Sequence, residues 1–211
     1  MSRAAPVRLL LVRHGQSTWN ADGRWQGRAD PPLSELGEQQ AAAAIPVVRA
    51  HAGSESPVSH IWASPLQRAR RSAGIVADGL GLEVEEDVRL QEVDAGEWTG
   101  LTREQIEAGW PGYLAEHRRP PGFEAREHLI ARALEVLGEI AASSGPGPVL
   151  VLTHGGLIGA VEGHLDAEWV RTPNFGGREV LHAPDGLGLE LGARFLLFDP
   201  DAVEVTIPGQ I

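Results

Sequence analysis

The sequence predicts an α/β fold with three layers, in which a mostly parallel sheet carries helices on both faces. Near-continuous apolar runs of strand length stand at 7–13, 58–64 and 149–154, and such runs are typical of strands buried on both faces of a parallel sheet. Helical patterns separate these runs at the spacing that crossover connections require. The chain has 211 residues, enough for one well-formed core, so we expect a single domain over residues 1–211.

The first half of the chain alternates strands and helices. In order, we expect a strand over 7–13, a helix over 33–51, a strand over 58–64, a helix over 65–80 and a short strand over 82–87. Ser34 suits the start of the first helix, and Pro46 predicts a kink or break within it. Pro65 suits the first turn of the second helix.

The second half begins with a loop over 88–102 that is too rich in glycine and acidic residues to be regular. Thr102 and Gln105 predict a capping box for a short helix. The segment 124–143 is a convincing amphipathic helix, and the strand over 149–154 runs into a helix that starts with two glycines. The remaining apolar segments have the pattern of hairpin or edge strands; they are 178–183, 188–199 and 202–207.

Two absent residue types narrow the chemistry. The chain contains no cysteine, which excludes disulfides, thiolate zinc sites and a cysteine nucleophile. It also contains no lysine, so all 18 basic side chains are arginine, and this excludes a lysine Schiff base or the lysine of a Walker loop. Any phosphate would have to be held by guanidinium, imidazole or backbone N–H groups.

The net charge of −11 argues against nucleic acid or an acidic membrane as a partner. No apolar run approaches the length needed to cross a bilayer. The segment 1–12 shows no small-residue cleavage site and runs directly into Arg13 and His14, so we expect a mature first strand and a cytoplasmic protein.

Polar groups follow three of the predicted strands. They are Arg13 and His14 after the first, Ser64 with Arg68 one turn later after the second, and Thr153, His154 and Gly155 after the third. Ligands bind at the carboxyl ends of strands in open α/β sheets, so these groups converge if the strands are parallel. The helix that begins at Gly155 adds free N–H groups and a positive dipole end. This inventory predicts a site for a phosphoryl group.

Four segments carry a resemblance to a known family: "LVRHGQSTWN" (11–20), "ASPLQRARRSA" (63–73), "LQEVDAGEWTGL" (90–101) and "VLTHGG" (151–156). Together, and in this order, they resemble the histidine phosphatase superfamily, in the branch that includes cofactor-dependent phosphoglycerate mutases and many small phosphatases. The resemblance spans about residues 7–164. It implies a phosphoglycerate mutase-like fold.

The resemblance also implies roles for individual residues. His14 matches the nucleophile that becomes a phosphohistidine, and Glu92 matches the acid that protonates the leaving oxygen and then activates water. The phosphoryl pocket would be formed by Arg13, Arg68 and His154, with Asn20 as an added donor. Gln26 and Gly27 match the loop on the substrate side, and neither a metal nor an organic cofactor is expected.

Alternatives to a phosphatase remain open. In mutases of this family, Arg-His-Tyr and a long basic insertion follow the catalytic glutamate, whereas Val93 and Asp94 follow Glu92 here, which favours the phosphatase branch. Arg118 and Arg119 faintly resemble the mutase arginine pair, but a solvated turn is the interpretation that we favour for them. A phosphate-binding module that has lost catalysis is the second alternative. A metal site on the two histidines is disfavoured, because the arginines would repel a cation.

The segment 97–123 holds four of the aromatic residues, Trp98, Trp110, Tyr113 and Phe123. We interpret it as a cover over the active site that shapes the leaving-group pocket, or else as a satellite core under a long loop. Phe123 and Ala125 depart from the Pro-Gly-Gly-Glu-Ser common in the family, so the sequence leaves the small phosphorylated substrate unidentified. The late strands offer an edge through which a homodimer could form.

Overall fold

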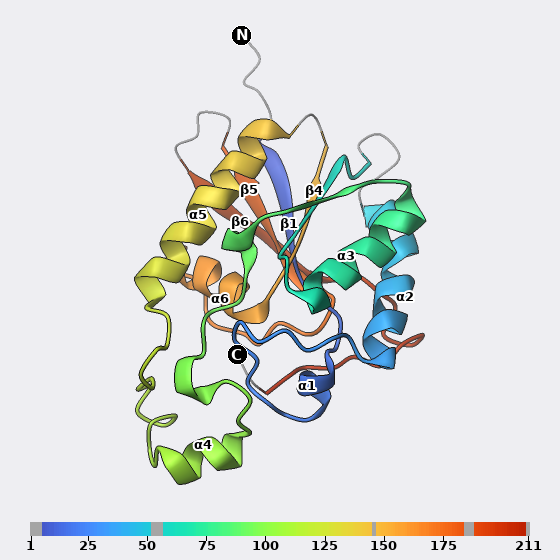
Figure 1. Cartoon of the computed structure of the whole chain (residues 1–211). Helices are drawn as coiled ribbons and strands as arrows, with labels where there is room; N and C mark the ends of the chain where they lie inside the picture. Colours follow the sequence, from blue (N-terminus) through green and yellow to red (C-terminus); the bar gives the residue numbers. More distant parts are fainter. Residues whose placement is uncertain (1–5, 52–56, 145–146, 184–187, 210–211) are drawn as a thin grey trace.

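The computed structural model describes residues 6–51, 57–144, 147–183 and 188–209 (Figure 1). Residues 1–5 of the predicted amino-terminal segment lie outside that part. The strands are β1 (Val7–Arg13), β2 (His60–Ala63), β3 (Val84–Glu86), β4 (Val149–Thr153), β5 (Gly176–His182) and β6 (Leu189–Leu196). They form one six-stranded sheet in the order β3-β2-β4-β1-β5-β6.

The helices alternate with these strands along the chain. They are α1 (Thr18–Ala21), α2 (Glu35–His51), α3 (Gln67–Leu80), α4 (Arg103–Gly109), α5 (Arg126–Ser143) and α6 (Gly155–His164), with single 3₁₀ turns at η1 (Val88–Leu90) and η2 (Gly96–Trp98). Among the described residues, no helix is long and apolar enough to cross a membrane.

The centre of the sheet is parallel. β4 pairs in parallel with β1 and with β2, and β3 pairs in parallel with β2, whereas β5 and β6 form an antiparallel hairpin on the far side of β1. The register places Arg13 opposite Thr153 and Ala63 opposite Leu152. The predicted convergence of three strand ends is therefore confirmed, since β1, β2 and β4 end at the same edge of the sheet.

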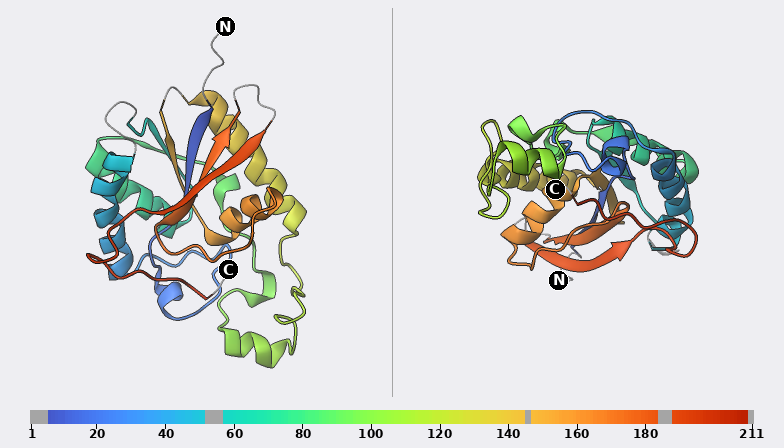
Figure 2. Two further views of the ribbon diagram at one scale, coloured as in Figure 1. Left: turned by 180° about the vertical axis from the view of Figure 1, so that it is seen from behind. Right: turned by 90° about the horizontal axis from the view of Figure 1, so that it is seen from below.

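Helices cover both faces, which confirms the predicted three layers (Figure 2). Side chains at Leu9, Leu11 and Val151 pack with α5 and α6 on one face. Those at Leu10, Val12 and Leu150 pack with α2 and α3 on the other. Leu129, Ala133, Val136, Leu137 and Ile140, the predicted apolar face of α5, are all buried. Side chains that alternate in direction along β1 and β4 thus contribute to two hydrophobic cores, one on each face of the sheet.

Three local expectations need correction. The break expected at Pro46 does not occur, since α2 continues past it; Ala44 and Val48 on either side are fully buried in the core and hold the helix in place. The segment 202–207 is not a strand. Its carbonyl groups are instead satisfied by Gln40 Nε2, which donates to the Glu204 carbonyl at 2.9 Å, and by the Asn174 N–H, which donates to the Thr206 carbonyl at 2.9 Å.

The third correction is α1, a single turn within the predicted loop between β1 and α2. Ser17 and Asn20 form a reciprocal capping box around it, which satisfies its free N–H groups. The expected capping box of Thr102 and Gln105 does start α4, and Ser34 does accept from the N–H of Gly37 at the start of α2 at 3.1 Å.

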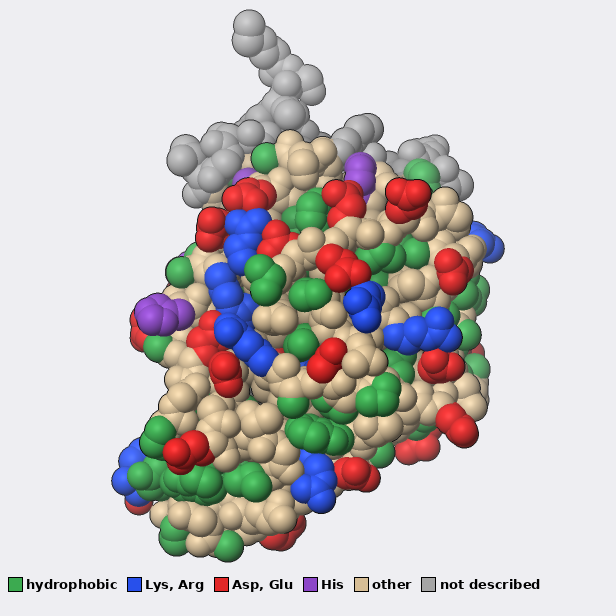
Figure 3. Space-filling view, viewed as in Figure 1, with side chains coloured by type: hydrophobic (Ala, Val, Ile, Leu, Met, Phe, Trp, Pro, Cys, Tyr) green, Lys and Arg blue, Asp and Glu red, His purple; other side chains and the backbone are tan. Residues whose placement is uncertain are grey.

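The segment 97–123, which includes α4, projects beyond the carboxyl edge of the sheet (Figure 1). It has a small apolar core of its own, which holds Trp25, Ala95, Trp98 and Ile106. The rings of Trp25 and Trp98 lie edge to face with centroids 5.1 Å apart. In the space-filling view, apolar side chains also gather on the surface over α4 (Figure 3).

Candidate active site

His14 follows β1 directly, where the parallel strands end. Its ring Nδ1 lies 2.6 Å from the Gly15 carbonyl and must donate to it, because a carbonyl oxygen can only accept. In the neutral ring the lone pair is therefore on Nε2, and the Nε–H of Arg68 donates to that atom at 3.2 Å. Nε2 is the nitrogen available for attack, and it faces a guanidinium group.

The environment of His14 keeps its ring neutral. Burial lowers the pKa of His14 well below the ordinary value of 6.5, and the charges of Arg68 and Arg13 lower it further, against the opposing effect of the Gly15 carbonyl. A neutral imidazole retains its lone pair at physiological pH. The ring therefore needs no separate base to free its lone pair.

Arg68 lies at the start of α3 and is fully buried, whereas its neighbours Arg70 and Arg71 are exposed. Its two Nη groups donate to the carbonyls of Ala29 at 2.7 Å and Gly27 at 2.8 Å. Burial lowers the pKa of Arg68 to about 10, which leaves it charged at neutral pH. The loop predicted to line the substrate side thus orients this guanidinium.

Arg13 points from the end of β1 towards the start of α6. Its Nη1 donates to the Thr172 carbonyl at 2.9 Å, and burial lowers its pKa to about 10 against the raising effect of Glu92. A Cβ added at Gly155 would lie 2.9 Å from that Nη1. Glycine at this position lets the guanidinium approach the amino-terminal end of the helix.

His154 caps α6, and its ring lies edge to face with that of His14 at a centroid distance of 5.1 Å. Its Nε2 is 2.8 Å from the Ser64 hydroxyl. Burial lowers the pKa of His154 well below 6.5, as do the charges of Arg68 and its other neighbours. Ser64, His14 and His154 therefore meet from three different strand ends.

Three buried nitrogens around His14 have no hydrogen-bond partner in the described part of the chain. They are Nε of Arg13, Nδ2 of Asn20 and Nδ1 of His154. An unsatisfied buried donor is costly, and such groups are uncommon in folded proteins. All three belong to residues of the predicted phosphoryl pocket, and an oxyanion bound there would supply hydrogen-bond partners.

Asn20 and Gln26 are linked through Ser17. The Ser17 hydroxyl donates to Gln26 Oε1 at 2.7 Å and accepts from the Asn20 N–H at 3.0 Å. Gly27 has a φ of +49°, and a Cβ there would lie 2.7 Å from the Ala95 nitrogen, so only glycine lets this loop approach the 92–96 segment. The predicted substrate-side residues thus form one connected wall.

Glu92 lies in the loop after η1 and is buried. Its Oε1 accepts from the N–H of Val93 at 2.8 Å, and its Oε2 accepts from the N–H of Gly156 at 3.1 Å. A side chain at Gly156 would collide with this carboxyl group. Glu92 therefore faces the start of α6, beside His154 and Arg13.

Sequence reasoning missed two side chains that support this site. Asn174 Nδ2 donates to the His14 carbonyl at 2.8 Å, and Arg132 Nη2 donates to the Glu92 carbonyl at 3.0 Å. Backbone carbonyls accept these bonds, and such bonds leave no residue pattern.

A cavity of about 620 Å³ opens next to Asn20. Asn20 borders both the cavity and the phosphoryl site, whereas His14 is buried and does not line the cavity. Its walls come from α1 and its flanks, the start of α4 and the segment 204–209; the charged lining residues are Asp22, Arg103, Glu104 and Glu204. The segment 97–123 contributes only its Thr102–Glu104 corner, so the cover expected over the leaving-group side supplies a small part of this cavity.

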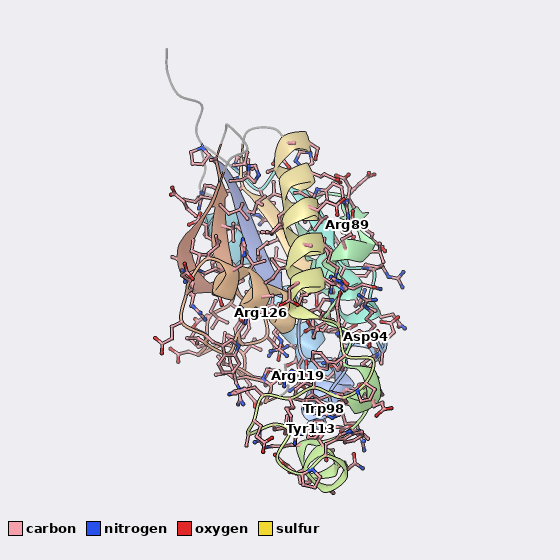
Figure 4. The ribbon with its side chains drawn as sticks, turned by 90° about the vertical axis from the view of Figure 1, so that its left-hand side faces the viewer. Arg89, Asp94, Trp98, Tyr113, Arg119 and Arg126 are labelled. Atoms are coloured by element: carbon pink, nitrogen blue, oxygen red, sulfur yellow. The ribbon has the colours of Figure 1, made fainter. Side chains whose placement is uncertain are left out.

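The arginine pair of the cover packs on aromatic rings. The Arg118 guanidinium lies 3.9 Å from the Tyr113 ring centroid and its Nε is 2.8 Å from a carboxyl oxygen of Glu116. Arg119 lies 5.6 Å from the Trp98 ring and 5.1 Å from the Phe123 ring, and burial lowers its pKa. Figure 4 shows Trp98, Tyr113 and Arg119 grouped at this end of the molecule.

Comparison with known proteins agrees with this geometry. The family model of the histidine phosphatase superfamily (branch 1) matches residues 9–174. The chain belongs to that superfamily. It is 38% identical over 171 residues to a glucosyl-3-phosphoglycerate phosphatase of Mycobacterium tuberculosis, covering 75% of this chain and 74% of that protein.

Two further relatives frame the activity. A probable phosphoglycerate mutase of Salmonella choleraesuis is 37% identical over 164 residues, covering 74% of this chain and 73% of that protein. The solved structure of a mycobacterial glucosyl-3-phosphoglycerate phosphatase with inorganic phosphate superposes with a TM-score of 0.75 at 30% identity. The superposition covers 93% of this chain and 99% of the other.

These relatives confirm the phosphoglycerate mutase-like fold and the prediction of a histidine phosphatase, a phosphoric monoester hydrolase, and they favour it over the mutase alternative.

Proposed function

We propose that this phosphatase works through a phosphohistidine on His14, with Glu92 as the general acid and base. The observation that carries the proposal is the buried cluster around His14. It combines a neutral imidazole that carries its lone pair on Nε2, next to the Arg68 guanidinium, with two charged guanidinium groups and three buried nitrogens that have no partner among the described residues. These features complement the negative charge on a phosphoryl group during its transfer.

In the first half-reaction, the Nε2 lone pair of His14 forms a bond to phosphorus while the bond from phosphorus to the leaving oxygen breaks. Arg13, Arg68, His154 and Asn20 stabilise the charge on the three other phosphoryl oxygens. Glu92, in its acid form, gives its proton to the leaving oxygen, so that an alcohol departs. Gly155 stands at the amino-terminal end of α6, where the free N–H groups and the positive dipole end of the helix favour an anion.

In the second half-reaction, the Glu92 carboxylate takes a proton from a water molecule, whose oxygen attacks phosphorus. The bond between phosphorus and Nε2 breaks and returns the electron pair to His14. Orthophosphate is released, and Glu92 ends the cycle protonated, as it began. Gly156 N–H and Val93 N–H hold the carboxyl group in one place through both steps.

The proposed chemistry uses neither a metal nor an organic cofactor. Two guanidinium groups stand where a cation would have to bind, and they repel it. The described residues contain no group of three or more histidine, aspartate or glutamate side chains arranged to hold a metal ion.

For the substrate, we propose a small phosphate monoester whose leaving group is rich in hydroxyl groups. The cavity beside Asn20 is lined by three carboxyl groups and one guanidinium. Carboxylates and amides bind hydroxyl groups well, and they disfavour a leaving group with further acidic groups. The compound in the name of the mycobacterial relative has the hydroxyl groups of its glucosyl part but also the carboxyl group of its glycerate part, so it fits only the first of these two preferences. We propose no nucleic acid as a partner. A cytoplasmic location and a homodimer formed through the edge of β6 remain predictions.

The test is phosphate release from matched alkyl and aryl monoesters in the presence of a chelator. It is combined with a radiolabelled substrate and an assay for phosphohistidine, whose bond between phosphorus and nitrogen is labile in acid and stable in alkali. We expect release in chelator and label on His14. Glu92→Gln should slow alkyl substrates by about 10²–10⁴-fold and p-nitrophenyl phosphate much less, since nitrophenolate leaves without a proton. Equal losses on both would refute the role of Glu92, and label elsewhere would refute that of His14.

A further inference from the structure

Glu124 and Arg132 form an ion pair behind the loop that carries Glu92. Arg132 Nε donates to Glu124 Oε1 at 2.8 Å, and its Nη2 donates to Oε2 at 2.9 Å. The two side chains are only 14% and 10% exposed, and a bidentate pair of this kind is both strong and directional. Burial alone would raise the pKa of Glu124, but the hydrogen bonds and charge of Arg132, together with the Asp94 N–H and the charge of Arg28, hold that pKa below its ordinary value.

The remaining donors of Arg132 all reach backbone carbonyls of one short stretch. Nη1 donates to the carbonyls of Arg89 and Gln91, each at 2.6 Å, and Nη2 donates to that of Glu92 at 3.0 Å. α5 is a long helix packed against the sheet, so it is a rigid base for this guanidinium. Through these bonds it fixes the backbone at the residue that bears the proposed acid.

Glu124 extends the connection to the opposite wall of the site. Its Oε2 accepts from the Asp94 N–H at 3.2 Å, and its Oε1 accepts from Arg28 at 3.1 Å. Arg28 lies between Gly27 and Ala29, whose carbonyls hold Arg68. One carboxyl group thus joins the loop of the acid to the loop that orients the phosphoryl-binding arginine.

The tether of the Glu92 carboxyl group explains why the loop position matters. One of its two donors, the N–H of Val93, belongs to the same loop and moves with it. Only the N–H of Gly156 is anchored elsewhere. A misplacement of about 1 Å can cost about 10²-fold in rate, so a loop held only at Gly156 would not keep the acid in line with the leaving oxygen.

We propose that Glu124 and Arg132 are positioning residues for proton transfer by Glu92. They touch no reacting atom and act by fixing the backbone of residues 89–94 against α5. This inference rests on the proposed role of Glu92. The role differs from that of Arg13 and Arg68, which bind the phosphoryl group itself. It predicts that loss of the pair lowers kcat more for poor leaving groups than for good ones, which a purely structural ion pair would not do.

The test compares Arg132→Met with the wild-type enzyme on a series of monoesters from p-nitrophenyl to alkyl phosphate. We expect kcat on alkyl phosphate to fall by about 10²-fold and kcat on p-nitrophenyl phosphate to fall by less than about 5-fold, because that leaving group needs little help from an acid. In a Glu92→Gln background, Arg132→Met should cost less than about 3-fold more, because residues that act as a unit are not additive.

Arg89→Met is the matched control. Arg89 joins the same loop to α5 through Asp87, Glu135 and Glu139, but its side chain bonds none of the carbonyls that Arg132 holds. Figure 4 shows it well separated from Asp94 along the flank of α5. We expect all substrates to be hydrolysed within about 3-fold of the wild-type rate, since its partners on α5, Glu135 and Glu139, are exposed and ion pairs with exposed partners contribute little.

The outcomes separate the two proposals. If Glu92→Gln itself shows no dependence on the leaving group, the proposed function fails. If Glu92→Gln shows it and Arg132→Met loses equally on all substrates, or adds its full loss to that of Glu92→Gln, the positioning role is overturned. Should Arg132→Met not fold, Glu124→Gln serves instead, because it keeps the shape of the pair; we expect the same pattern at smaller size, and a uniform loss would overturn the inference.

Discussion

The phosphoryl side and the leaving-group side of this molecule are built differently. On the phosphoryl side, Arg13, His14 and His154 emerge from strand ends that the sheet register fixes, and they are almost completely buried. On the leaving-group side, the cavity walls come from α1, the corner of α4 and the segment 204–209, none of which belongs to the sheet. In the proposed mechanism the chemistry is therefore held by the core, whereas selectivity depends on segments that can change without disturbing it.

The strongest way to break the phosphoryl side is His14→Ala. It removes the attacking nitrogen, so we expect kcat to fall by at least about 10⁴-fold on every monoester, by analogy with the loss of other covalent nucleophiles. The matched control is His60→Ala, at the opposite end of β2, which should keep near wild-type activity. Substantial turnover by a correctly folded His14→Ala protein, as judged by circular dichroism, would rule out the phosphohistidine route.

Arg68→Lys tests the geometry of the pocket while keeping the charge. Arg68 uses three separate nitrogens to reach the two loop carbonyls and His14, and the single ammonium nitrogen of lysine cannot reproduce that spacing. We therefore expect a loss of about 10²–10³-fold in kcat, as for the removal of an oxyanion donor. Arg70→Lys, on the exposed face of the same helix, should change kcat by less than about 2-fold. Equal effects at both positions would show that position 68 contributes only charge.

The same contrast explains how far the sequence could lead. His14, Ser64 and His154 were predictable as neighbours because apolar runs identify parallel strands, and the carboxyl ends of such strands meet. Arg68 was predictable because it lies one turn beyond such an end. Asn174 and Arg132 were not, since they reach the site through backbone carbonyls far away in the sequence, and α1 was hidden in a loop because a one-turn helix has no periodicity to detect.

Acid stability should also separate the two sides. The folded pKa values of His14 and His154 lie below 6.5, so below about pH 6.5 the unfolded chain binds protons that the folded chain does not. Stability is therefore complete above pH 6.5 and is lost as the pH falls below it, by up to about 1.4 kcal/mol per pH unit for each histidine. Urea unfolding between pH 7.5 and 5 measures this slope.

His154→Gln should make that slope shallower, and a change on the cover, such as Trp110→Phe, should leave it unchanged. Glu162 acts in the opposite direction, because burial raises its pKa against the charges of Arg194 and Arg178, and an acid with a raised pKa loses its contribution as the pH rises. The difference between variant and wild-type slopes is therefore the informative quantity. An identical slope in His154→Gln would contradict a neutral, buried His154.

The smallest expected effect is on the leaving-group side and tests its independence from the chemistry. Glu204→Gln alters one carboxyl group of the cavity without touching the phosphoryl site, so it should act on binding that the ground state and the transition state share. We expect KM for a hydroxyl-rich monoester to rise by about 3–10-fold with kcat unchanged, and KM for a monoester with a second acidic group to fall, because a repulsive charge is gone. A change in kcat of the same size as the change in KM would mean that the cavity wall takes part in the reaction itself, and the division between a fixed phosphoryl side and a variable leaving-group side would then not hold.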